Sequence, residues 1–201
     1  MARGYRGMTP EERLADRRER LLLAAYTEFA DPGFSETTIE RLCAVARISN
    51  RAFYECFTGR QELMRAVFER CVDDTTAAVV QAMRAAPDTL DAQVEAGVRA
   101  YVRFVTADRR RARIMTLEVR RADDRVNAFR RQKLAVLAQM MEKALSEFPD
   151  GAPDNVRMLV LGVLGALQEL LADYLASPKP EHLDEVIRTG AHMFRASLTA
   201  R

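Results

Sequence analysis

Tryptophan is absent from this chain of 201 residues, cysteine occurs three times, and only seven prolines and nine glycines are present to interrupt regular structure. The cysteines at positions 43, 56 and 71 form neither a CxxC pair nor a metal-ligand spacing, which fits a reducing cytoplasm. We expect Cys43 to be a small buried residue on a helix face. Cys56 could act as a redox switch, but a structural thiol is the simpler interpretation.

Charge of one sign and long apolar runs are also scarce. The formal net charge is only +2, and residues 1–60 hold ten arginines against nine acidic residues, so bulk charge does not indicate a nucleic-acid binder. The longest apolar run, Met158 to Leu167, has ten residues, whereas a membrane span needs about 20. The N-terminal sequence MARGYRGMTPEER lacks the apolar core of a signal peptide. We therefore expect a cytoplasmic protein without a membrane partner.

Catalytic arrangements are missing from the sequence as well. It contains no phosphate-binding glycine motif, no HExxH and no Gly-x-Ser-x-Gly. Its two histidines, His182 and His192, are ten residues apart on one expected helix and point to different faces, which is not a metal-ligand pair. Glu169 and Asp173 share a helix face, but such carboxylate pairs are common. We expect no enzyme activity, no metal and no cofactor.

What the sequence does contain is a helix-rich composition, 48% apolar with abundant Ala, Leu, Arg and Glu. The central stretch is residues 37–63, TTIERLCAVARISNRAFYECFTGRQEL. Thr37 or Thr38 stands where a helix would begin, and Glu40 has the capping-box spacing from Thr37. Ser49 is placed to cap a second short helix, from about Asn50 to residue 57. The pattern predicts a helix-turn-helix unit whose second helix enters the DNA major groove.

The same stretch resembles the N-terminal signature of TetR-family transcriptional regulators. The resemblance covers about residues 10–70 and is carried by these positions: Thr38, Ile39, Leu42, Ala46, Ile48, Ser49, Phe53, Tyr54, Phe57, Glu62 and Leu63. Arg47 replaces the usual turn glycine, Cys56 a common histidine, Gly59 a Ser or Asn cap, and Arg60 the usual lysine. A left-handed turn at Arg47 would cost roughly 1 kcal/mol relative to glycine.

The resemblance implies that Thr38, Ser49, Tyr54 and Arg60 hold DNA phosphates and that Asn50, Arg51 and Ala52 face base edges. These residue types suit those roles, since Arg can pair with guanine, Asn with adenine, and Ala can lie beside a thymine methyl group. A purely structural role for Tyr54 is the alternative. Two recognition helices in a two-fold dimer would lie roughly 34–36 Å apart and require a palindromic operator.

The order of the remaining segments predicts two domains in an all-α fold of about nine helices. Residues 1–8 form an arm that either reaches the minor groove or has no role, and Thr9–Glu12 begins the first helix of a three-helix DNA-binding module. A long helix then runs from Gly59 to about Ala86, and we place the boundary near residue 60. Residues 1–60 would form the helix-turn-helix domain, and residues 61–201 the effector-binding and dimerisation domain.

Nine arginines lie between residues 108 and 131, against four acidic residues. One interpretation is a cationic pocket mouth for an anionic effector; the other is a solvated face spread over two helices. Asp123 or Asp124 is expected to cap the helix that follows. The effector-pocket candidates are aromatic and Met residues, which equally suit plain core: Tyr101, Phe104, Met115, Phe129 and Met141.

The segment after Asp154, VRMLVLGVLGALQELLADYL, is apolar on every side near its start, so both its faces must be covered. A homodimer partner could cover one face, with Gly162 and Gly165 allowing close approach; a wholly internal core helix is the alternative. The dimer-interface candidates lie on this helix and the last one: Leu161, Leu164, Gln168, Leu171, Val186 and Phe194.

These features lead to one main hypothesis. The chain is a ligand-responsive transcriptional regulator, expected to be a repressor that a small-molecule effector releases from its operator, with coupling through the long helix after Gly59. A helical small-molecule-binding protein with a non-functional DNA head is the alternative.

Overall fold

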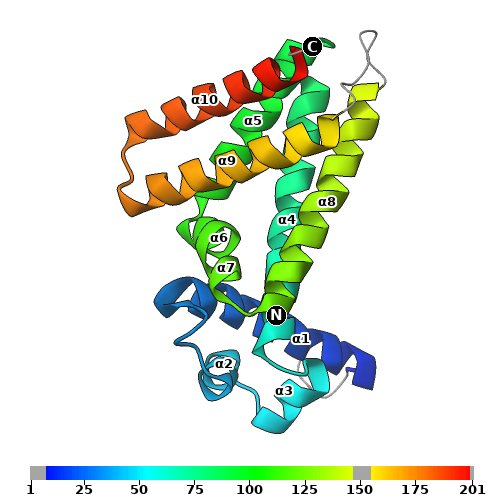
Figure 1. The fold of residues 1–201 in the computed structure, drawn as a ribbon. Coiled ribbons are helices and arrows are strands. Elements are labelled where there is room, and N and C mark those ends of the chain that lie inside the picture. The colour runs from blue at the N-terminus through cyan, green and yellow to red at the C-terminus, as the bar shows by residue number, and fades with distance from the viewer. Residues whose placement is uncertain (1–7, 147–154, 200–201) are drawn as a thin grey trace.

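A computed structural model describes residues 8–146 and 155–199 (Figure 1). The helices are α1 (Pro10–Glu28), α2 (Ile39–Ala46), α3 (Asn50–Cys56), α4 (Arg60–Ala85), α5 (Leu90–Ala107), α6 (Arg109–Arg113), α7 (Val119–Arg121), α8 (Asp124–Ser146), α9 (Val156–Ala176) and α10 (Pro180–Thr199). Two further segments complete the order: η3 (Ile114–Glu118) has wider turns of π-helix type, whereas η2 (Phe29–Gly33) contains a kink at Asp31, whose backbone is extended. The described residues contain no strand, which confirms the all-α expectation.

The first three helices form a head at one end of the molecule (Figure 1). Thr9 caps α1 in a full capping box, in which its hydroxyl accepts from the Glu12 N–H and the Glu12 carboxylate accepts from the Thr9 N–H. The capping box expected at Thr37 is wrong. Thr38 is the cap of α2, whereas Thr37 is fully buried and donates its hydroxyl to the carbonyls of Glu28 and Gly33. A buried hydroxyl needs such partners, and these two tie α2 to the end of α1.

Arg47 ends α2 in the left-handed conformation, with φ of 53°. This is the position at which sequence reasoning expected a glycine-type turn. We predict that Arg47→Gly raises the free energy of unfolding by about 1 kcal/mol, because glycine has no Cβ to clash in this conformation. Urea unfolding followed by circular dichroism measures the change. Val45→Gly, at an exposed helical position of α2, is the control and should lower stability by about 0.5–1 kcal/mol. An Arg47→Gly protein no more stable than the parent would contradict the prediction.

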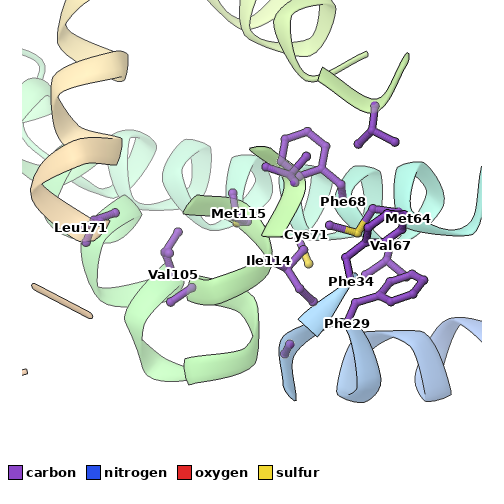
Figure 2. Packing of buried hydrophobic residues seen from close by; sticks show 14 of the residues in the cluster. Phe29, Phe34, Met64, Val67, Phe68, Cys71, Val105, Ile114, Met115 and Leu171 are labelled. Atoms are coloured by element: carbon purple, nitrogen blue, oxygen red, sulfur yellow. The ribbon is translucent and has the colours of Figure 1, made fainter. Parts of the chain in front are cut away.

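The long helix α4 leads from the head into the body, where it packs against α5, α8 and η3 (Figure 1). Its first turns belong to the junction core: Figure 2 shows Met64, Val67 and Phe68 lying beside Phe29 and Phe34. All five side chains are at most 5% exposed. The junction is therefore a continuous apolar core and not a flexible hinge.

The body is closed by α9 and α10, which pack on each other (Figure 1). Gly190 of α10 permits this contact, because a Cβ there would lie 2.4 Å from a Leu167 methyl group and 3.1 Å from Val98. Asp123 caps α8 by accepting from the Val126 N–H at 2.9 Å, as one of the two expected aspartates. The expected cap of α9, Asp154, lies outside the described residues.

Candidate nucleic-acid interface and effector cavity

Helix α3, the predicted recognition helix, presents a polar outer face on a buried apolar back. Phe53 is fully buried, whereas the Arg51 side chain is 91% exposed and Tyr54 is 60% exposed. Asn50 is also exposed, and Ala52 is half-buried. The Tyr54 ring packs edge-on against Phe53 with centroids 5.4 Å apart, so its ring is positioned while its hydroxyl remains outside. This arrangement offers a guanidinium, an amide and a phenol on the surface of one short helix.

Three arginines of α1 hold α3 and the end of α2 in place. Arg17 pairs with Glu55 at 2.6 Å, and Arg18 donates to the Cys56 carbonyl at 3.0 Å. Arg18 also lies 4.2 Å over the Phe57 ring. Arg20 donates from Nε to the Ala46 carbonyl at 2.9 Å and also reaches the Arg47 carbonyl.

The bonds from Arg18 and Arg20 reach carbonyls at the carboxyl ends of α3 and α2, which lack partners within their own helices. Sequence reasoning missed these contacts. Their only signal was a cluster of arginines on a helix that was expected merely to supply core residues.

The expected phosphate contacts are placed as follows. Thr38 and Ser49 are exposed, and each hydroxyl accepts from the backbone three residues ahead at 3.2 Å, leaving its own hydrogen to donate. Arg60 differs, because its Nη1 donates to the carbonyls of Phe34 and Thr37 and its guanidinium lies 5.1 Å over the Phe34 ring. Part of the Arg60 guanidinium is thus committed to the α1–α2 connection.

The cysteines lie in surroundings that suppress thiolate formation. Burial raises the pKa of Cys43 and Cys56, and it raises that of Cys71 to about 12. Because the thiolate is the reactive form, these values favour the structural interpretation over a redox switch. The described residues contain no group of three or more His, Cys, Asp or Glu side chains placed to bind a metal.

A cavity of about 290 Å³ lies in the body between α4, α5, α8 and α9. Its volume is at the low end of the roughly 300–1,000 Å³ typical of ligand pockets. Its wall is mostly aliphatic and Met side chains, with a few polar groups, among them Thr75, Gln93, Lys133 and Gln168. Of the five effector-pocket candidates, Tyr101, Met115 and Met141 line it.

Phe104 and Phe129 do not line this cavity, which corrects the prediction for both. Phe104 lies under the Arg111 guanidinium at 3.9 Å, and the Phe129 ring packs edge-on against Phe68 with centroids 6.5 Å apart. Periodicity identified them as inward residues but could not distinguish core from cavity wall.

Two of the nine arginines in the arginine-rich stretch, Arg113 and Arg121, contribute to the junction between body and head. The buried Glu118 carboxylate accepts from Arg113 and Arg121, both at 3.3 Å, and from the Phe34 N–H at 3.1 Å. Arg113 also donates to the Ala30 carbonyl at 2.6 Å. The stretch is thus neither a uniformly solvated face nor a single cationic mouth.

The structure corrects most of the proposed dimer interface. Within a single chain five of the six candidates are at most 7% exposed, and only Leu161 is partly accessible; the buried ones are Leu164, Gln168, Leu171, Val186 and Phe194. They point into the body, where α9 packs on α8 and α10. The outward face of α9 carries Met158, 65% exposed, and Gly162, with nothing within 4 Å of a Cβ there.

By length and composition α9 could also cross a membrane, and a third of its most apolar window (33%) is buried in the fold. Core helices of helical proteins have the same properties, so this feature does not indicate a membrane protein.

Comparison with known proteins gives concordant results. Residues 21–67 match the sequence profile of the bacterial regulatory proteins, tetR family. A curated relative, the HTH-type transcriptional activator FasR of Mycolicibacterium smegmatis, is 32% identical over 93 residues. The alignment covers 46% of this chain and 42% of that relative, so the chain spans less than half of the relative's length in the match.

Solved structures share the whole fold at low identity. The fatty acid degradation regulator FadR of Bacillus halodurans superposes with a TM-score of 0.75 at 16% identity, covering 92% of this chain and 97% of its own. FadR of Bacillus subtilis, solved in complex with stearoyl-CoA, superposes with a TM-score of 0.74 at 12% identity, covering 90% and 97%.

Proposed function

We propose that this chain, whose residues 21–67 match the bacterial regulatory proteins of the tetR family, is a regulator of that family and binds a palindromic operator in double-stranded DNA as a homodimer. The observation that supports this proposal most is the outer face of α3, where Asn50, Arg51 and Tyr54 are exposed on a helix anchored by α1. In this proposal Arg51 and Asn50 contact base edges and Ala52 lies against them. Tyr54, Thr38 and Ser49 donate hydroxyl hydrogens to phosphates, and Arg60 supplies charge beside them.

A binding assay tests this directly. Fluorescence anisotropy or gel mobility shift with the DNA flanking its own gene should give saturable binding that weakens steeply with salt, since phosphate contacts release counterions. A scrambled duplex of equal composition is the control. Equal affinity for both duplexes would contradict operator recognition. No binding to either, with the cavity still taking up ligand, would favour the helical ligand-binding protein with a non-functional head.

We propose further that the protein is a cytoplasmic repressor with two domains. Residues 1–60 would bind DNA, and residues 61–201 would bind the effector and form the dimer. Repression requires only that the bound dimer occlude a promoter, with no further contact. The FasR relative is named an activator, so transcription in vitro with and without the protein is the necessary measurement. A rise in transcript on addition of the protein would show activation and contradict the proposed repression.

The effector is proposed to be a small apolar molecule in the cavity, which releases the protein from DNA. Support comes from α4, because Phe68, Val72 and Met83 on this helix line the cavity and its first residue, Arg60, follows α3 closely. The Bacillus subtilis FadR structure contains stearoyl-CoA, which agrees with an apolar effector in a similar fold. A ligand that widens the cavity would displace α4 and with it the recognition helix. Two packed domains that shift relative to each other are a common form of such switching.

The revised dimer face makes a prediction. We expect Met158→Asp to raise the dimer dissociation constant at least tenfold, because a two-fold interface loses the buried methionine twice and gains two charges. Sedimentation velocity over a concentration series measures the change. Leu23→Asp on α1, also an exposed apolar position at 58%, is the matched control and should leave the mass unchanged. An unchanged dimer in the Met158→Asp protein would exclude this face.

A further inference from the structure

Two arginines of the body converge on one neutral acceptor. Arg120 of α7 donates to the side-chain oxygen of Gln168 at 3.2 Å, and Arg130 of α8 donates to the same oxygen at 3.4 Å. Arg120 has a second partner on its outer side, Glu169. Arg130 forms no ion pair with a carboxylate within the described part of the chain. One amide oxygen therefore serves two guanidinium groups.

Both guanidinium groups are incompletely satisfied. The Nε atoms of Arg120 and Arg130 are buried and have no hydrogen-bond partner in the described structure. Burial lowers the pKa of Arg130, and the neighbouring charges of Arg120 and Arg131 lower it further. Two adjacent half-buried cations that share one exposed anion, Glu169, repel each other, and unpaired buried polar atoms such as their Nε groups are rare in folded proteins. Such a pair gains most from an anion.

The acceptor that they share is also part of the cavity wall. Gln168 is 4% exposed and lines the cavity together with Tyr101, to which it is hydrogen-bonded. Burial raises the pKa of Tyr101 to about 12, so its hydroxyl stays protonated and can donate. Lys133 is the cation that lines the cavity, and it is already engaged by Glu69 and by the Phe129 ring. The unsatisfied charge therefore lies at the Gln168 side of the cavity.

From this geometry we propose that the effector is an unbranched carboxylate, with its chain in the apolar cavity and its carboxylate received by Arg120, Arg130 and Tyr101 where Gln168 now stands. The Gln168 side chain would turn aside, and Arg pairs bidentately with a carboxylate. A cavity of about 290 Å³ lies near the lower limit of ligand pockets, so a chain of medium length suits it, and decanoate serves as the probe. This inference rests on the proposed function, because it names the effector of that same cavity.

Binding of decanoate and decanol by calorimetry, without DNA, tests the head group. Decanoate should bind at least tenfold more tightly than decanol, since the two differ in the charge that the arginines would pair. Arg130→Met should reduce the affinity for decanoate to that for decanol. Arg125→Met, at an exposed arginine of the same helix, should leave the difference between the two affinities intact. Equal binding of decanoate and decanol to the parent protein, or no effect of Arg130→Met, would overturn the proposal.

Two further arms make the result unambiguous. Decanoyl-CoA has no free carboxylate on its chain, so its binding should not depend on Arg130; a dependence equal to that of decanoate would assign the site to the nucleotide phosphates and overturn the carboxylate. Because burial and the charges of Arg120 and Arg131 disfavour the Arg130 cation, Arg130→Met should also raise the melting temperature without ligand, which verifies folding; Arg120→Met is the second variant. Decanoate that binds as expected but leaves the parent protein on DNA would contradict only the proposed function, whereas release of DNA binding by other ligands without decanoate binding would contradict only this inference.

Discussion

The double variant Arg51→Ala with Tyr54→Ala should bind operator DNA at least a hundredfold more weakly than the parent. An arginine that pairs with a base contributes about 1–3 kcal/mol, and a dimer loses each contact in two half-sites. Both side chains are largely exposed, so their removal should leave the fold intact. Anisotropy titration at fixed salt measures the loss, and circular dichroism melting verifies the fold.

The control for this variant is Arg188→Ala. Arg188 is exposed on α10, at the end of the molecule opposite α3 (Figure 1). The Arg188→Ala substitution removes one positive charge without changing the head. It should change the affinity for operator DNA by less than about threefold, because surface charges beyond a Debye length of about 10 Å are largely screened. If the double variant retained parental affinity, the assignment of α3 as the DNA-contacting element would be wrong.

The second large effect is expected at Glu118. Replacement by alanine should lower the free energy of unfolding by about 3–5 kcal/mol, because Arg113 would lose the partner of a buried ion pair and the Phe34 N–H would be left unpaired. Glu118 is 2% exposed, and its carboxylate lies so close to Gly33 that a Cβ there would be 3.1 Å from it. Urea unfolding measures the loss.

Two comparisons make the Glu118 experiment specific. Glu118→Gln keeps an acceptor for the Phe34 N–H, so it should recover a substantial part of the stability. Glu19→Ala breaks an ion pair with Arg70 on the surface, and exposed pairs of this kind contribute about 0–1 kcal/mol. If Glu118→Ala cost no more than Glu19→Ala, the junction network would be marginal to stability.

Local signals in the sequence were enough to predict the helices of the head. Thr9, Ser49 and the apolar spacing of residues 39–57 define their helices through bonds to residues three or four positions away, so a linear reading identifies them. Even Arg47 was expected at a turn that the structure shows to be left-handed. The capping prediction at Thr37 was wrong because the Thr37 hydroxyl donates to the carbonyl of Glu28, nine residues earlier, and a capping pattern covers only the residues that follow.

Contacts between distant segments were not accessible in the same way. Phe104 and Met115 both looked like inward residues, but only their neighbours in space decide that one lies under Arg111 and the other lines the cavity. The prediction of the dimer-interface residues was wrong for a related reason. Apolarity on all sides of α9 showed that two faces needed covering, but not that Leu171 faces its own chain and Met158 faces outward.

The apolar core at the junction also affects how the chain unfolds. Phe29 and Phe34 of the head are covered by Met64 and Val67, which lie beyond the proposed domain boundary near residue 60 (Figure 2). A fragment cut at that boundary would lose one wall of its interior and expose large aromatic rings to water, at a cost of roughly 1.5–3 kcal/mol for each ring uncovered. The head formed by α1, α2 and α3, to which we assign DNA binding, thus depends on the start of α4 for its folding, and the two proposed domains share that segment.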